Sequence, residues 1–180
     1  MSGALVERHR RTLAEWLSAS RIDCALQRLP EDQRREFLEA SALSWVRIST
    51  LEATFRELGK ELNEDPAQLQ IDVVKRSVEA NVRGIWSILM RLTTNEALVK
   101  RLPRIYARAY DGGEVVIDAV GPRDATFHVR GWQRMPEYAR RGLAAGTEAV
   151  LYVAGRKDVR VKQVPGDDAS VTRFAVRWRS

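Results

Sequence analysis

Apolar residues recur at helical spacing from about Ala4 to Tyr110, and charged residues occupy the intervening faces. In the first apolar stripe Leu5, His9 and Leu13 follow one another four residues apart, so His9 falls on or beside the buried side of a helix. No second metal-ligating residue is placed with His9, and we interpret it as a partly buried or surface histidine. The pattern predicts that this part of the chain is helical almost throughout.

Helix starts within this region carry local signals. Acidic residues suit the positive end of a helix, and Ser or Thr with Glu three residues later forms a capping box. Proline is favoured in the first helical turn and removes a hydrogen-bond donor farther in. These signals predict helices from Pro30 to about Ala42, after the box of Ser49 and Glu52, from Pro66 (capped by Asp65) to about Leu92, and after the box of Thr93 and Glu96, with a bend or restart at Pro103.

From Asp111 onward the hydrophobic period changes from helical to two, which is typical of strands. The run EVVIDAV places Val115, Ile117 and Ala119 on one face, and ATFHVRG follows it after a turn. DVRVKQV and VTRFAVRW form a second pair of strands nearer the C-terminus. Between these two predicted hairpins lies a helix from Pro136 to Gly155.

The order of elements predicts an α+β fold, in which an N-terminal helical layer packs on a four-stranded antiparallel sheet with C-terminal order β-β-α-β-β. The chain of 180 residues is long enough for one ordinary domain. We therefore predict a single domain over residues 1–180, with a helical half at 1–110 and a ββαββ half at 111–180.

The net charge of +6 raises the question of nucleic-acid binding. Up to Tyr110 the chain has 18 basic and 15 acidic residues, and from Asp111 on it has 12 and 9, so the charges are well mixed. No apolar run approaches a membrane span, and the N-terminus lacks the apolar core of a secretion signal, which together favour a soluble, cytoplasmic protein. Cys24 is the single cysteine and is interpreted as a small buried apolar residue.

The sequence does not contain the combinations of residues that usually form a catalytic site or a metal site. The sequence contains no Gly-x-Ser-x-Gly elbow and no phosphate-binding loop with its Lys and Ser or Thr. His128 alternates with the apolar residues of its predicted strand and should face outward. No His, Cys and carboxylate cluster suits a metal. We therefore expect a protein that is not an enzyme and holds no metal.

Two glycines spaced four apart, Gly142 and Gly146, stand within the helix from Pro136 to Gly155. Small residues at this spacing favour close packing of another element, and a pocket for a small apolar ligand is the alternative. The candidate pocket residues are Tyr106, Tyr110, Phe127, Trp132, Tyr138, Gly142 and Gly146.

Basic residues alternate with the inward apolar residues of the strands and should share the outer face of the sheet. A solvated face explains them first, and docking of an acidic protein partner is the alternative. Nucleic acid is disfavoured because the face lacks aromatic residues on which bases could stack. The candidate partner-binding residues are Arg130, Arg160, Lys162, Arg173 and Arg177.

The runs LPRIYARAYDGGEVVIDAVGP, RGWQRMPEYARRGLAAGTEAVLYVAGRKDVRVK and FAVRW resemble a paralogous family of proteins expanded in myxobacteria. That family is similar to the superfamily of heme nitric-oxide-binding domains, four-vinyl-reductase domains and Bet subunits of vesicle-tethering particles. The resemblance spans about Trp45 to Trp178. It implies helices packed on a four-stranded antiparallel sheet and, in several branches, an apolar ligand between them.

The departures from that superfamily concern its cofactors. Heme-binding members use a histidine ligand and a Tyr-x-Ser-x-Arg motif, which this sequence lacks, and the cysteines of four-vinyl-reductase sensors have no counterpart here. We therefore expect neither cofactor. The function expected is that of a regulatory or sensor-like domain that binds a small apolar ligand or a protein partner; an interaction module or homodimer that uses the basic sheet face is the alternative, and nucleic-acid binding comes third.

Overall fold

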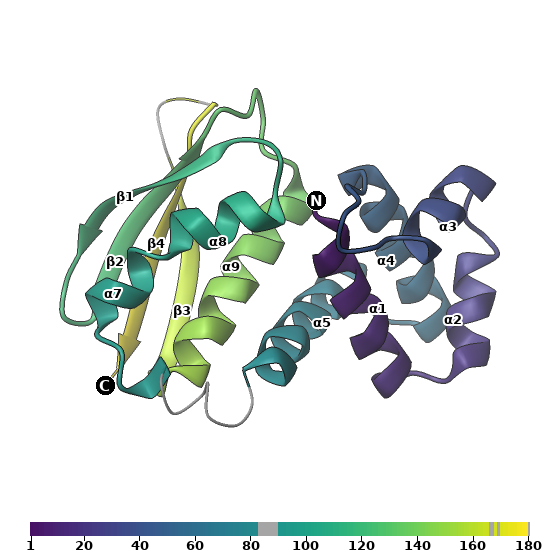
Figure 1. Cartoon of the computed structure of the whole chain (residues 1–180), viewed down its shortest axis with the longest axis horizontal. Coiled ribbons are helices and arrows are strands. Elements are labelled where there is room, and N and C mark those ends of the chain that lie inside the picture. The colour runs from purple at the N-terminus through teal and green to yellow at the C-terminus, as the bar shows by residue number, and fades with distance from the viewer. Residues whose placement is uncertain (83–89, 166–167, 169, 180) are drawn as a thin grey trace. The chain divides into compact units, whose positions relative to one another are not determined.

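The computed structural model describes residues 1–82, 90–165, 168 and 170–179 (Figure 1). The chain divides into two compact units. The first unit comprises Met1–Ser77 and Glu137–Gly142, and the second comprises Val78–Pro136 and Leu143–Ser180. The single-domain assignment stays a prediction, and each unit is described by itself below.

The described elements alternate as the sequence predicts, with helices first and the strands in two pairs around a long helix (Figure 1). Their bounds are α1 Gly3–Trp16, α2 Ala19–Leu26, α3 Glu31–Leu38, α4 Ile48–Leu62, α5 Pro66–Asn81, α7 Asn95–Val99, α8 Leu102–Ala109, β1 Glu114–Val120, β2 Asp124–Arg130, α9 Glu137–Val153, β3 Lys157–Val164 and β4 Thr172–Arg179.

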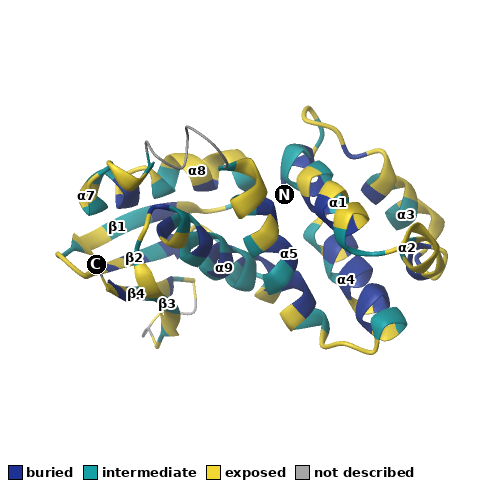
Figure 2. Cartoon of the chain, turned by 90° about the horizontal axis from the view of Figure 1, so that it is seen from below, coloured by how far each residue is buried: buried dark blue, intermediate teal, exposed yellow. Residues whose placement is uncertain are grey.

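Helix α4 forms the centre of the first unit. Figure 2 shows buried positions along α4 and mainly exposed positions along α2 and α3. The core side chains of α4, Leu51, Phe55 and Leu58, are at most 2% exposed, and they recur at the helical spacing that the sequence predicts. Burying a side chain of this size stabilises the fold by about 1.5–3 kcal/mol.

Helix α4 does not begin with the predicted capping box at Ser49. It begins at Ile48, and Arg47 at the N-cap makes no side-chain cap. Glu36 of α3 instead accepts hydrogen bonds from the backbone N–H of Arg47, at 2.9 Å, and from the hydroxyl of Thr50. A carboxylate from another helix therefore supplies the negative charge at this helix start, which local sequence cannot reveal.

The predicted start at Pro66 is confirmed, because α5 begins there and Asp65 Oδ1 accepts a hydrogen bond from the N–H of Ala67 at 3.1 Å. The predicted continuation of this helix toward Leu92 passes through residues 83–89, which lie outside the described part of the chain. The next capping residue is Thr94 and not Thr93, since the side chain of Thr94 accepts from the N–H of Ala97. The restart near Pro103 is confirmed, because Pro103 lies in the first turn of α8.

The α+β fold class and the ββαββ order are confirmed. The four strands form one antiparallel sheet in the order β1-β2-β4-β3. Helix α8 and the part of α9 from Leu143 lie on one face of this sheet (Figure 1). The buried side chains on that face include Phe127 and Phe174, whose rings stack with centroids 5.0 Å apart.

One predicted inward position of the sheet is wrong. The register of β1 against β2 shifts between Ile117 and Ala119, and Ala119 is exposed. The sequence period of two predicts Ala119 on the inner face, but an extra residue in one strand turns the positions beyond it to the other side.

The outer face of the sheet carries the five predicted basic residues. Arg160 of β3 is directly opposite Arg177 of β4, which in turn is opposite Asp124 of β2. Arg173 lies two positions before Ala175, the partner of Lys162, and Arg130 pairs with Glu114 across β1 and β2. All five side chains are exposed, so their predicted common face is confirmed.

The pair of Arg160 and Arg177 gives a test of the sheet register. Like charges directly opposite one another destabilise a sheet, and opposite charges stabilise it by about 0.2–1 kcal/mol. We expect Arg160→Glu to raise the midpoint of urea unfolding. Lys162→Glu changes the net charge equally but faces Ala175, so it should raise the midpoint less; an equal effect of both substitutions at low and high salt would contradict the register.

Candidate functional site

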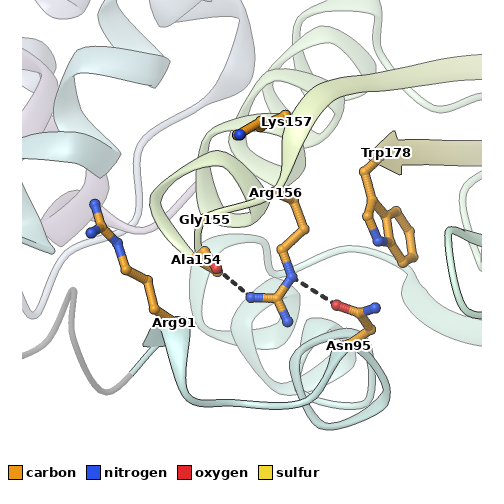
Figure 3. Close-up of a pocket in the computed structure, with 7 residues that line it drawn as sticks. All are labelled: Arg91, Asn95, Ala154, Gly155, Arg156, Lys157 and Trp178. Carbon is orange, nitrogen blue, oxygen red and sulfur yellow. Dashed lines mark hydrogen bonds between the residues drawn. The ribbon is translucent and has the colours of Figure 1, made fainter. Parts of the chain in front are cut away.

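The second unit contains a pocket at the end of α9, with a volume of about 610 Å³. It opens to solvent and combines residues from the segment before α7 and the start of α7, from the turn between α9 and β3 and the start of β3, and from the end of β4 (Figure 3). Its lining residues are Arg91, Asn95, Ala154, Gly155, Arg156, Lys157 and Trp178. Three of these seven residues are cationic and none is acidic.

The floor of the pocket is built by the way α9 ends. Gly155 has φ 87°, a left-handed conformation that glycine adopts without strain. The N–H of Gly155 donates to Tyr152 O at 2.8 Å and the N–H of Arg156 donates to Leu151 O at 3.1 Å, which is the Schellman pattern. This termination reverses the chain at once and places Arg156 and Lys157 at the start of β3.

Arg156 holds the segments around the pocket together. Its Nε donates to Asn95 Oδ1 at 2.7 Å and its first terminal nitrogen donates to Ala154 O (Figure 3). Its second terminal nitrogen donates to Thr93 O at 2.7 Å. Asn95 in turn contacts the turn between β1 and β2, because its side-chain amide donates to Pro122 O at 2.9 Å. Partial burial lowers the pKa of Arg156 from its usual value, although the group remains a cation.

Trp178 forms the wall at the end of β4 and is 4% exposed. Its backbone N–H donates to Arg123 O at 3.0 Å, whereas its indole Nε1 is buried and has no hydrogen-bond partner in the described part of the chain. In Figure 3 the indole nitrogen is on the side of the ring turned toward Arg156. A buried donor without an acceptor costs about 1–3 kcal/mol.

The first unit contains a second buried polar group, His9 of α1. His9 is 1% exposed, so the predicted partly buried or surface position is wrong. Burial lowers its pKa to about 4, with a further contribution from the charge of Arg8. Both ring nitrogens lack a partner among the described residues, whereas Thr12 on the same helix is bonded to Ser77 at 2.9 Å.

An aromatic ring packs against His9. Its ring lies edge-on to Phe55 with centroids 6.3 Å apart, and Phe55 contacts Tyr138 with centroids 5.8 Å apart. Gln70, beside them, is satisfied at both ends, because it donates to Tyr138 O at 2.8 Å and accepts from Arg141 at 3.1 Å. His9, Phe55 and Tyr138 are called the His9 cluster below.

Three of the predicted pocket residues lie together in the second unit. Tyr106 stacks on Tyr110 with centroids 4.9 Å apart, and its hydroxyl donates to Gly112 O at 2.9 Å and accepts from Trp132 Nε1 at 2.8 Å. Trp132 also covers Gly113, where an added Cβ would lie 2.4 Å from the indole. The indole of Trp132 is thus satisfied by the hydroxyl of Tyr106, and burial raises the pKa of Tyr110 above its usual value.

The other predicted pocket residues are distributed over both units. Phe127 stacks on Phe174 in the sheet, Tyr138 and Gly142 belong to the first unit, and Gly146 belongs to the second. Both glycines are half-buried on α9. A ligand role for these residues stays a prediction, as does a partner role for the basic face.

A family model matches residues 10–179 and carries the description "Protein of unknown function (DUF2378)". The chain belongs to the DUF2378 family. Among curated proteins, none matches it.

The fold of this DUF2378 chain is similar to that of H-NOX proteins. The crystal structure of the Fe(II) unliganded H-NOX protein from K. algicida matches with a TM-score of 0.72 at 9% identity, covering 100% of this chain and 97% of that chain. An oxygen-binding H-NOX domain related to soluble guanylate cyclases matches with a TM-score of 0.66 at 11% identity, covering 100% and 96%. At these identities the likeness shows the fold alone, and the predicted similarity to heme nitric-oxide-binding domains is confirmed at the level of the fold. The other superfamily names and the myxobacterial expansion stay predictions.

Sequence reasoning missed both the pocket at the end of α9 and the burial of His9. The predicted burial of Cys24 is wrong, because this residue is exposed. Gly155 followed by Arg156 and Lys157 was a usable signal, because glycine commonly ends a helix and cations favour that end. His9 shares its stripe with Leu13, which is 1% exposed. The opposing residues Arg91 and Trp178 are far apart in sequence, and only the fold brings them together.

Within the described ranges, no helix is long and apolar enough to cross a membrane. The same ranges contain no group of three His, Cys, Asp or Glu residues that could hold a metal ion.

Arg156 should contribute measurably to stability. A lysine at this position cannot make the three bonds of a guanidinium, so we expect Arg156→Lys to lower the free energy of unfolding by about 1.5–3 kcal/mol, as measured by chemical denaturation. Arg91→Lys is the matched control, because Arg91 lines the same pocket without a bond to another described residue, and it should change stability by less than about 0.5 kcal/mol.

His9 should make stability depend on pH. Its folded-state pKa lies below the unfolded value of 6.5, so its contribution to stability is complete above pH 6.5 and is lost as the pH falls toward 4. The full loss is about 3 kcal/mol. We expect His9→Leu to flatten the unfolding free energy between pH 6.5 and 4 relative to the unsubstituted chain, whereas His128→Gln, a change on the outer sheet face, should leave that slope in place.

Proposed function

We propose that this chain is a sensor-like, non-enzymatic domain that binds a small, largely apolar molecule. The fold supports the proposal, because the chain follows H-NOX proteins over its full length and one of them is an oxygen-binding domain. The described residues with perturbed pKa values also support it, since they do not assemble a nucleophile, a base and an orienting group.

The observation that carries the proposal is the pair of unpartnered nitrogens on His9. With a pKa near 4 the imidazole is neutral at physiological pH, so one nitrogen is an N–H donor and the other is an acceptor. Both nitrogens are buried, and an unmade hydrogen bond at such a site costs about 1–3 kcal/mol. His9, Phe55 and Tyr138 are at most 2% exposed, so a small apolar molecule with one polar group would have to displace part of this packing to bond to His9.

Heme is a poor fit to the described donors, although the K. algicida protein contains Fe(II). A heme iron takes an axial His, Cys, Met or Tyr. His128 is bonded to Asp118 at 2.7 Å on the outer sheet face, Cys24 is exposed, and the hydroxyl of Tyr106 is shared between two partners. His9 lies edge-on against Phe55 among fully buried residues, which disfavours a group as large as a porphyrin more than it disfavours a small molecule. The proposed ligand is therefore organic, and no part of the proposal runs through heme.

A second candidate function is docking of an acidic protein partner on the outer sheet face. The observation that favours it is the exposed pair of Arg160 and Arg177, two like charges held directly opposite one another. An acidic surface would relieve that repulsion. A homodimer through this face is less favoured, because it would bring more positive charges together.

Native mass spectrometry and thermal shift of the full chain test the leading proposal. We expect a co-purifying organic mass, or a rise in melting temperature with indole, whose single N–H can donate to the acceptor nitrogen of His9. His9→Leu should abolish the response and His128→Gln should keep it. A Soret absorption band that disappears in His9→Leu would replace the organic ligand by heme, and a response to indole that survives His9→Leu would place the ligand elsewhere.

A further inference from the structure

We propose that the pocket at the end of α9 is a binding site for a small anion bearing a phosphate or carboxylate group. This site is independent of the His9 cluster, both in its residues, which all belong to the second unit, and in the chemistry that it recognises. Its volume of about 610 Å³ lies within the range of small-molecule sites.

The charge of the pocket is uncompensated. Within the described part of the chain, neither Arg91 nor Lys157 has an ion-pair partner. The nearby carboxylates are engaged elsewhere, since Asp158 pairs with Arg179 at 3.2 Å and Glu96 pairs with Lys100 at 2.6 Å. Three cations around one concave surface favour an anion with two or more negative charges.

Arg156 is already positioned to contribute without losing its structural bonds. A guanidinium has five N–H donors, and three of those on Arg156 bond to Asn95, Thr93 and Ala154. The remaining donors are held in a fixed orientation, so a ligand meets a preorganised group. Arg91 and Lys157 are exposed and supply charge from more flexible side chains.

Trp178 provides the observation that is independent of charge. Its indole Nε1 is buried without an acceptor and lies in the wall of the pocket. An anionic oxygen is a strong acceptor for an N–H group, so binding would satisfy this donor. The aromatic ring beside it favours a ligand whose anionic group is attached to a flat apolar body.

The site is tested by NMR titration of the full chain with pyrophosphate and, separately, with benzoate, following the indole N–H resonance of Trp178. Trp178→Phe assigns that resonance. We expect a saturable downfield shift that weakens as salt is raised. Pyrophosphate binding alone indicates a phosphate ligand, and tighter binding of benzoate indicates an aromatic carboxylate.

Three variants decide whether the pocket is the site. Arg91→Gln and Lys157→Gln should each weaken binding about five- to tenfold, and Arg160→Gln, which removes an exposed cation from the outer sheet face, should leave it within about twofold. The proposal is overturned if the Trp178 resonance does not move with 10 mM of either probe, or if Arg160→Gln weakens binding as much as the pocket variants. Retention of the other indole resonances in each variant shows that the fold is kept.

Discussion

The second unit depends on the side chain of Arg156. This residue follows the left-handed Gly155 that ends α9, and its guanidinium joins three carbonyl oxygens from the α9 terminus, the residue before Thr94 and the side chain of Asn95. Asn95 continues the connection to the turn between β1 and β2. The cation of Arg156 thus connects the end of α9, the start of α7 and the turn between β1 and β2. Arg91 and Lys157 lie around the open pocket beside it.

Two of the buried polar groups that the described chain leaves unsatisfied, His9 in the first unit and Trp178 in the second, have different surroundings. His9 packs against the ring of Phe55 and is held neutral by its burial. Trp178 is a permanent neutral donor next to three cations. The first environment suits a molecule with little charge, and the second suits an anion, so the two units would respond to different chemistry.

The sequence predicts the sheet and α9 because their apolar residues recur at strand or helix spacing. This local pattern agrees with the faces that the fold buries. It fails where a distant residue acts. Glu36 replaces the expected capping box at Ser49, and the register shift in β1 exposes Ala119. The pocket could be predicted only in part. Gly155 indicates the end of a helix, but nothing in the local sequence pattern indicates that Trp178 lies near it. His9 shows the reverse case, because its stripe indicates burial while its polarity suggests exposure.

Helix α9 has a consequence for the order in which the protein is made. The first unit is not a continuous stretch of chain, because it is completed by Glu137–Gly142. Gln70 bonds to a carbonyl 68 residues farther along, and Phe55 packs against Tyr138. During translation the N-terminal helices therefore lack these packing and hydrogen-bond partners until the start of α9 has emerged from the ribosome. Completion of the first unit and synthesis of the second are coupled, and a chain that stops at residue 77 would lack part of its own core.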